Sequence, residues 1–355
     1  MNNVPIIQKR WWDIDVIRKG VSLDDILFFT KHLSIGLKTG LTLLDGLEML
    51  RDQSVGTMKE ILVDIVESVK SGQPFYKALE RHSQYFPSMY VSLVETAEHA
   101  GRLEENLNYL AEDLLKDFDM RRKIRGAMAY PAIVLVLIIV LAVVVSIFIM
   151  PKITPVFESF DIELPLATRV IIFITDTVKT QGILVGIACL AIYGIARFLY
   201  QRNVVKAFIQ SIILKLPIIG DIVKKVYVAR FSRSIVTLLS SGITLDHGLK
   251  ISASSTNNLI YKKAILSFIV EIEKGKQLAT AMSYYPSLFP ILSTRMIAMG
   301  EQTGSLTTTL QYLTEFYENE VDSTLKNLSV ILEPILLIFI GGMVGVLALA
   351  ILGPF

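Results

Sequence analysis

The chain has 355 residues, of which 52% are hydrophobic and 19% charged, and its mean hydropathy is +0.52. Soluble proteins usually contain about 45–50% apolar and about 25% charged residues, so this composition indicates a membrane protein. The net charge of +2 argues against a nucleic-acid partner, and the single cysteine, Cys189, excludes an internal disulfide and a cysteine-based metal site.

Residues 1–21 are predicted to form a charged N-terminal arm without a sustained helical period. Trp11 and Trp12 in this arm suit a lipid interface, a partner's groove or simple local packing. We therefore assign the arm no fixed secondary structure.

Residues 22–128 predict a first bundle of about six antiparallel helices. Ser22 is suited to cap the first helix, Gly40 to end it, and Thr42 to cap the second. Four further helices are expected at residues 58–70, 75–81, 88–99 and 103–125.

Three apolar segments are predicted to cross a membrane. Residues 132–149 carry no charge and, at about 1.5 Å per residue, are long enough for the hydrocarbon layer, so 129–151 is the first span. Residues 182–200 and 332–353 are the second and third spans.

Basic residues set the predicted orientation. Residues 121–125 are rich in Arg and Lys, whereas the short segment 152–181 mixes acidic and basic residues. The positive-inside rule therefore places the first bundle in the cytoplasm, 152–181 outside, and the connector 201–226 and a second bundle, 227–331, again in the cytoplasm. The C-terminus is then outside. Residues 165–181 fit either an in-plane helix or the first turns of the second span.

The two bundles are related in sequence. The stretch 29–49, FTKHLSIGLKTGLTLLDGLEM, recurs at a shift of 202 as 231–251, FSRSIVTLLSSGITLDHGLKI. Beyond it the shift becomes 203. Identical pairs include Phe29/Phe231, Gly40/Gly242, Thr42/Thr244, Gly46/Gly248, Leu47/Leu249, Phe86/Phe289, Glu98/Glu301, Gly101/Gly304 and Pro131/Pro334. This pattern predicts a duplicated unit of about 110 residues followed by an apolar segment.

The sequence has no pattern for cradling a phosphate and no GxSxG or HExxH motif. The acidic side chains lie on the polar faces of helices, where solvation is their ordinary role. We therefore expect no enzyme, no catalytic residue, no cofactor and no metal-site residue, and whether a metal ion binds the bundles stays open.

Four residues near the third span are candidate contacts for another apolar helix. Glu333 and Pro334 stand at its cytoplasmic end, where a carboxylate can meet a polar group of a partner helix or remain in the headgroup layer near Lys326. Gly341 and Gly345 form a GxxxG pattern that permits close helix approach.

Leu325 and Leu328 are candidate self-association residues. They continue the apolar stripe of the second bundle, whereas Arg122 and Arg125 occupy the equivalent positions of the first. A second copy of the chain or the chain's own first bundle can cover these leucines, and we predict a homo-oligomer.

The doubled elements GLKTGLTLLDGLEML/TLLSSGITLDHGLKI and AEHAGRLEENLNYLAE/MGEQTGSLTTTLQYLTE, with the proline at the start of two spans, resemble the inner-membrane platform family of type II secretion and type IV pilus assembly. The resemblance covers about residues 22–353. It implies an all-α polytopic membrane protein with two duplicated cytoplasmic bundles and three transmembrane helices.

The resemblance also implies a function and partners. Such a platform is not an enzyme; it couples a cytoplasmic hexameric assembly ATPase to the insertion of pilin or pseudopilin subunits into a filament, beside inner-membrane alignment proteins. Glu333, Pro334, Gly341 and Gly345 then become candidate pilin contacts.

The alternative is a small polytopic transporter, for which internal duplication is common. Three spans, a duplication that lies mainly outside them and the absence of a midplane ion-binding cluster favour the platform. Neighbouring genes for an ATPase and pilins would separate the two. The type of filament, pilus, pseudopilus or DNA-uptake fibre, stays open.

Overall fold

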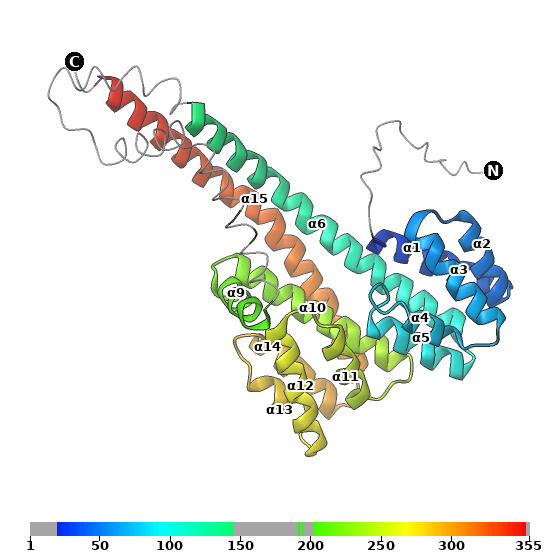
Figure 1. Ribbon diagram of the computed structural model, residues 1–355. Helices are drawn as coiled ribbons and strands as arrows, with labels where there is room; N and C mark the ends of the chain where they lie inside the picture. Colours follow the sequence, from blue (N-terminus) through cyan, green and yellow to red (C-terminus); the bar gives the residue numbers. More distant parts are fainter. Residues whose placement is uncertain (1–19, 145–190, 192–193, 195–201, 353–355) are drawn as a thin grey trace, which may run out of the picture. The chain divides into compact units, whose positions relative to one another are not determined.

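The structure is a computed structural model, and it describes residues 20–144 and 202–352 together with the isolated residues 191 and 194. Every regular element in these ranges is an α-helix, as the all-α prediction requires (Figure 1). The predicted arm up to residue 19, the segment 152–181 and nearly all of the span 182–200 lie outside the described residues.

The chain forms two compact units. Unit 1 comprises Met1–Phe118 and Ser234–Ser255, and unit 2 comprises Asp119–Arg233 and Thr256–Phe355. This division differs from the predicted bundles 22–128 and 227–331, because residues 234–255 of the second bundle pack with the first.

Unit 1 is built from short helices joined by tight turns. Its elements are α1 (Leu23–Lys38), α2 (Leu43–Gln53), α3 (Gly56–Lys70), α4 (Phe75–Glu80), α5 (Ser88–Ala100), the start of α6 (Leu103–Val144), the end of α10 (Ile219–Ser240) and α11 (Leu245–Ser255). Both predicted N-caps are confirmed, since Ser22 Oγ accepts the Asp25 N–H and Thr42 Oγ1 accepts the Asp45 N–H, each at 3.2 Å. Satisfying free N–H groups in this way determines where α1 and α2 begin.

The core of unit 1 draws on both halves of the sequence. Large buried side chains from the first half, such as Phe29, Leu62 and Phe86, share one cluster with Leu238 and Ile251 from the second. Burial of each such side chain contributes about 1.5–3 kcal/mol. The helix α11 is therefore an integral part of unit 1.

Unit 2 has an aromatic centre. Its elements are the second part of α6, α9 (Asn203–Lys215), the start of α10, α12 (Leu259–Glu273), α13 (Leu278–Ser283), α14 (Ile291–Gln302) and α15 (Leu306–Leu352). Phe231, Phe268 and Phe289 meet mainly edge to face, with ring centroids 5.4–6.2 Å apart. Tyr261 joins them and donates its hydroxyl to the Leu288 carbonyl at 2.9 Å, so its polar end is satisfied inside the core.

Residues that are identical in the two halves of the sequence lie in the cores or in the turns that end helices. The paired aromatics Phe86 and Phe289 are both fully buried. Gly40 and Gly242 have φ values of 91° and 86°, a conformation that other residues rarely adopt, because each ends a helix in a tight turn. The order α1 to α6 thus parallels the order α10 to α15.

Two helices continue into the apolar segments that follow the bundles. The helix expected at 103–125 continues through Pro131 to Val144, and α15 continues through Pro334 to Leu352. A proline removes one N–H donor and bends a helix without ending it when the flanking residues favour helix. No break in the helix therefore separates a bundle from the apolar segment that follows it, and the boundaries at 128 and 331 stay predictions.

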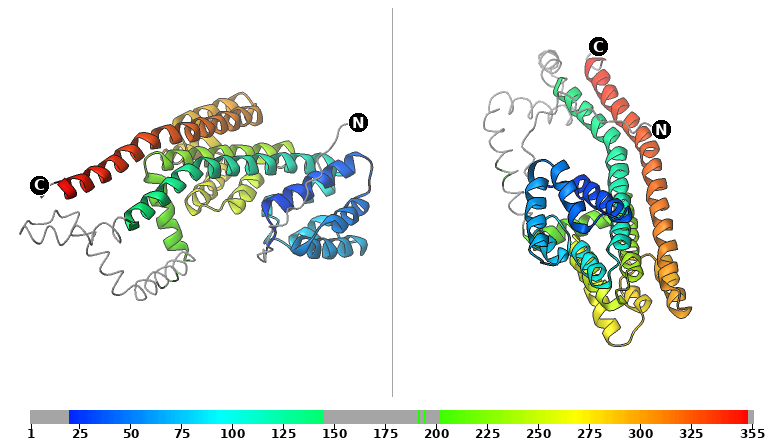
Figure 2. Two further views of the ribbon diagram at one scale, coloured as in Figure 1. Left: turned by 90° about the horizontal axis from the view of Figure 1, so that it is seen from above. Right: turned by 90° about the vertical axis from the view of Figure 1, so that its right-hand side faces the viewer.

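Within unit 2 the second part of α6 and α15 lie side by side and run in the same direction (Figures 1 and 2). Among the described residues no helix combines the length and the hydrophobicity needed to cross a membrane. The three predicted spans remain a prediction.

Candidate functional site

The motif that recurs most clearly, Glu-x-x-Gly at Glu98 and Glu301, has a structural role in both units. Glu98 on α5 accepts the N–H groups of Phe75 and Tyr76, at 2.8 and 3.0 Å, one on each carboxylate oxygen. Glu301 on α14 accepts those of Leu278 and Ala279 in the same way, at 2.6 and 2.9 Å. Each carboxylate caps the first turn of a six-residue helix, α4 or α13.

The same motif therefore has the same capping role in both halves of the sequence. A helix of six residues is too short to be stable alone, so it depends on packing and on satisfied terminal N–H groups. Sequence reasoning paired Glu98 with Glu301 but assigned them to solvated surface, because a cap that reaches back by more than 20 residues has no local signature.

The contact between α5 and α11 defines a second feature of unit 1. Ser88 Oγ lies 2.5 Å from Ser254 Oγ and 3.0 Å from Ser255 Oγ, and the Met89 N–H donates to Ser255 Oγ at 3.1 Å. Ser88 and Met89 are the first residues of α5, whose N–H groups have no partner within the helix. The serines of α11 thus complete the start of α5.

A lysine joins α10 to α15 within unit 2. Lys225 Nζ lies 2.9 Å from Asp221, 3.0 Å from Glu320 and 3.1 Å from the Thr324 hydroxyl. Burial by itself lowers the pKa of Lys225, but the hydrogen bonds to the two carboxylates outweigh it and raise the pKa. Lys225 therefore stays charged at neutral pH and holds the two helices together.

Two more ion pairs reach α15. Lys123 on α6 lies 2.9 Å from Asp322, and this contact, followed by that of Lys326, lowers the pKa of Asp322. The buried Arg233 lies 3.1 Å from Glu318. Pairing of a buried cation is needed because desolvation of an isolated charge is costly. These partners come from helices far apart in the sequence, and no spacing pattern pointed to them.

The apolar stripe of α15 is covered by its own chain at Tyr317, Val321 and Leu325, which are all buried. This burial agrees with cover by the chain itself, one of the two alternatives for Leu325, and self-association through Leu325 stays a prediction. The side chain of Leu328 lies outside the described residues, so its role in self-association stays a prediction.

The candidate helix contacts lie together on the second half of α15. Pro334 is exposed, as are Gly341 and Gly345, and a Cβ added at either glycine would meet nothing within 4 Å. The side chain of Glu333 lies outside the described residues. The space that a GxxxG contact requires is thus open at these two glycines.

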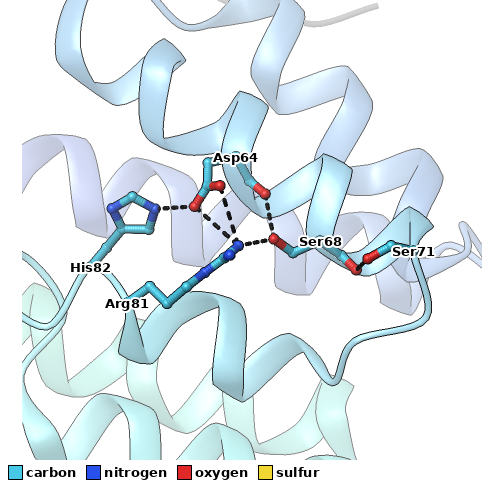
Figure 3. Close-up of polar contacts among 5 residues, drawn as sticks. All are labelled: Asp64, Ser68, Ser71, Arg81 and His82. Carbon is cyan, nitrogen blue, oxygen red and sulfur yellow. Dashed lines mark hydrogen bonds and ion pairs between the residues drawn. The ribbon is translucent and has the colours of Figure 1, made fainter.

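A cluster of polar side chains joins α3 to the end of α4 (Figure 3). His82 Nε2 lies 2.7 Å from Asp64 Oδ2, and Arg81 Nη2 lies 3.1 and 3.2 Å from the two oxygens of the same carboxylate. Arg81 also contacts the Ser68 hydroxyl, which donates to the Asp64 main-chain carbonyl at 2.7 Å.

This cluster is not a hydrolytic triad. The imidazole of His82 faces Asp64, and the Ser68 hydroxyl faces a main-chain carbonyl and a guanidinium, so no base is placed to take its proton (Figure 3). At the shift of 203, the positions 267, 271, 284 and 285 of the second half hold Ser, Glu, Tyr and Tyr. The cluster is thus particular to unit 1.

Replacement of Asp64 with asparagine is expected to destabilise unit 1 at neutral pH by about 0.5–1 kcal/mol, a value discounted for solvent because the Asp64 side chain is 44% exposed. Burial raises the pKa of Asp64, but hydrogen bonds from His82 and Arg81 outweigh it, and the pKa falls below 3.8. A lowered pKa gives stability that is present above pH 3.8 and is lost as the pH falls through the folded-state value.

The midpoint of thermal unfolding of the purified full chain checks this prediction. The Asp64→Asn protein should melt earlier than the natural protein at pH 7, and the difference should disappear in strong acid. Glu60→Gln, an exposed change on the same helix, is the control and should have little effect at either pH. A difference that persists in strong acid would contradict the assignment to the carboxylate.

The described residues contain no group of His, Cys, Asp and Glu side chains that could hold a metal ion. Their polar clusters cap helices and pair charges between helices.

Comparison with known proteins gives the family. The model of the family described as "Type II secretion system (T2SS), protein F" matches residues 29–151 and again residues 231–354. The chain is 33% identical to the type IV pilus assembly protein PilC of Thermus thermophilus, over 94% of this chain and 82% of that protein. It is 30% identical to PilC of Pseudomonas aeruginosa, over 96% of this chain and 94% of that protein.

A relative from the secretion branch matches almost as well. The type II secretion system protein F of Pseudomonas aeruginosa is 29% identical, over 95% of this chain and 83% of that protein. The family model matches the chain twice, and its two matches include both capping glutamates, Glu98 and Glu301. The chain therefore belongs to the family of type II secretion system protein F, which includes the type IV pilus assembly proteins PilC.

Proposed function

We propose that this protein is the inner-membrane platform of a type IV pilus or type II secretion machine. The observation that carries the proposal is the family match over both halves, together with relatives named for pilus assembly and for type II secretion. The platform is not an enzyme. It couples a hexameric cytoplasmic ATPase to the insertion of pilin or pseudopilin subunits into a filament, beside inner-membrane alignment proteins.

The long helices support this coupling role. α6 has 42 residues and α15 has 47, which at 1.5 Å per residue correspond to about 63 and 70 Å. Each runs without a break from a compact helical unit into an apolar sequence. Because no flexible joint interrupts either helix, a displacement of the compact helical unit is transmitted along the helix to its apolar segment.

The topology belongs to the same proposal. Spans at 129–151, 182–200 and 332–353 place the arm and both duplicated bundles in the cytoplasm and the C-terminus outside, on the distribution of basic residues. Copies of the chain associate in the membrane. Glu333, Pro334, Gly341 and Gly345 contact the apolar helix of a pilin subunit, for which the open space at the two glycines provides room.

A change in the middle of α15 tests the coupling. Asn327 is exposed, so Asn327→Ala removes little and keeps the helix, whereas Asn327→Pro removes one N–H bond and bends the helix before the apolar segment. We expect filament assembly to fall at least tenfold with proline and to continue with alanine. The measurement is surface filament in cells whose own copy of the gene is deleted.

Two controls separate coupling from misfolding. The proline variant must reach the membrane at the natural level and still recruit the ATPase there. The purified full chain, free of the ATPase, should neither bind nor hydrolyse ATP in calorimetric and phosphate-release assays. Filament assembly in the deletion strain, or ATP turnover by the purified chain, would refute the proposal.

A further inference from the structure

One face of α9 is apolar and exposed. Val204 is 82% exposed, Phe208 65% and Ile212 45%. These three residues, here called the α9 stripe, recur at every fourth position and so lie along one side of the helix. Exposed apolar side chains that cluster in this way mark a contact with a protein or a lipid.

The exposure of the α9 stripe follows from how the helix is held. Gln210, on the opposite side of α9, accepts the Leu259 N–H at 2.9 Å and so caps the start of α12. Leu214 is buried. At the end of the helix the chain turns sharply, with Ile218 at φ 65°, and a Cβ on Gly220 would lie 2.5 Å from the Leu214 carbonyl. α9 is thus fixed to unit 2 with its stripe facing away.

The charged residues of the α9 segment have one sign. Residues 201–220 contain Arg202, Lys206 and Lys215 and neither Asp nor Glu; Asp221 is the first acidic residue. Lys215 is exposed and lies one turn beyond Ile212. A short helix with an apolar side and only basic charges is typical of helices that lie in the headgroup layer of an anionic membrane.

The direction of α9 agrees with such a position. Within unit 2 it runs across the direction of α6 and α15, which lie side by side (Figure 2). A helix that crosses the direction of membrane-entering helices lies parallel to the membrane surface. α9 also begins directly after residues 182–200, the second proposed span, so its first turn starts at the membrane boundary.

We propose that α9 is an in-plane membrane anchor: the α9 stripe enters the boundary between headgroups and acyl chains, and Lys215 binds the phosphates of anionic phospholipids. The inference rests on the proposed membrane topology. It gives unit 2 a fixed height and orientation at the membrane surface, which a platform needs if a partner is to move it by a defined distance. A second protein copy is a poorer occupant, because α9 itself carries basic residues and no acidic residue to offset them.

The test uses the full chain with Cys189→Ser, reconstituted in nanodiscs of phosphatidylcholine with or without phosphatidylglycerol. A spin label is placed on Phe208→Cys, and its accessibility to oxygen is compared with its accessibility to a water-soluble nickel complex. Met299→Cys is the matched control, since Met299 is 66% exposed on α14 of the same unit. We expect position 208 to favour oxygen and position 299 to favour nickel.

The charges are tested separately from the stripe. Lys215→Gln should reduce the preference of position 208 for oxygen in discs that contain phosphatidylglycerol and leave it unchanged in phosphatidylcholine alone. Each lysine near an anionic surface changes the binding constant by about fivefold. An equal effect in both lipids would overturn the role of anionic headgroups.

Two results at position 208 would overturn the anchor. Equal preference for nickel at 208 and 299 would mean that the stripe faces water, and exclusion of both reagents from 208 would mean that protein covers it. Cysteines at Glu158 and Asn257, probed with an impermeant thiol reagent in intact cells, report the topology independently. Labelling at 257 would refute the proposed topology, whereas correct labelling with a water-exposed 208 would refute the anchor alone.

Discussion

Replacement of Leu238 with alanine is expected to loosen α5, a helix that lies about 140 residues earlier in the chain. Leu238 is fully buried in the core cluster of unit 1, and Gly248 of α11 packs against it, with 3.6 Å between an ideal Cβ on the glycine and the Leu238 Cβ. Truncation of a buried leucine costs about 2–5 kcal/mol. The loss should fall on unit 1, because Ser234–Ser255 belongs to that unit.

Hydrogen exchange of the full chain, read peptide by peptide, measures this effect. Leu238→Ala should accelerate exchange in α5, where Ser88 and Met89 depend on the serines of α11. Phe268→Ala is the matched control. It lies in the same half of the sequence but in the core of unit 2, and we expect a loss of about 3–5 kcal/mol with faster exchange in α12 and α13.

The opposite pattern would contradict the division of the fold. If Leu238→Ala accelerated exchange in α12 and left α5 unchanged, the two halves of the sequence would fold as separate bundles. The two variants should also be additive in their effects on melting, because they alter different cores.

Glu98→Ala is expected to destabilise unit 1 by about 3 kcal/mol, since it removes a charged acceptor from two N–H groups at the start of α4. Phe75 is fully buried, so water cannot easily replace the lost carboxylate at its N–H. Glu301→Ala should have the equivalent effect on α13 in unit 2. Glu98→Gln, which keeps one oxygen and loses the charge, should lie between alanine and the natural residue.

The amide exchange rates of Phe75 and Tyr76, with the melting temperature of the full chain, check this prediction. Glu104→Ala is the control, because Glu104 is exposed on the next helix. If Glu98→Ala melted at the same temperature as Glu104→Ala, the recurring Glu-x-x-Gly motif would have a role other than capping.

Much of the local structure follows from the sequence alone. The starts of α1 and α2 were predicted from Ser22 and Thr42, and the ends of α3 and α5 agree within one residue, because caps and helix ends depend on residues three or four positions apart. The doubled motifs led to the family, which the comparisons confirm. The same local reasoning ended the helix that begins at residue 103 at residue 125, whereas α6 continues through Pro131 to Val144.

The associations between distant segments were decided only by the tertiary structure. Nothing in the spacing of residues shows that α11 packs with α5, that Glu98 caps α4, or that Leu325 is covered by its own chain. An apolar stripe in a sequence indicates that one face of a helix must be buried. It does not indicate which surface covers that face, because any complementary surface meets the requirement. Which surface does so depends on the packing of the whole chain, since the free energy of burial is non-directional and shape selects the partner.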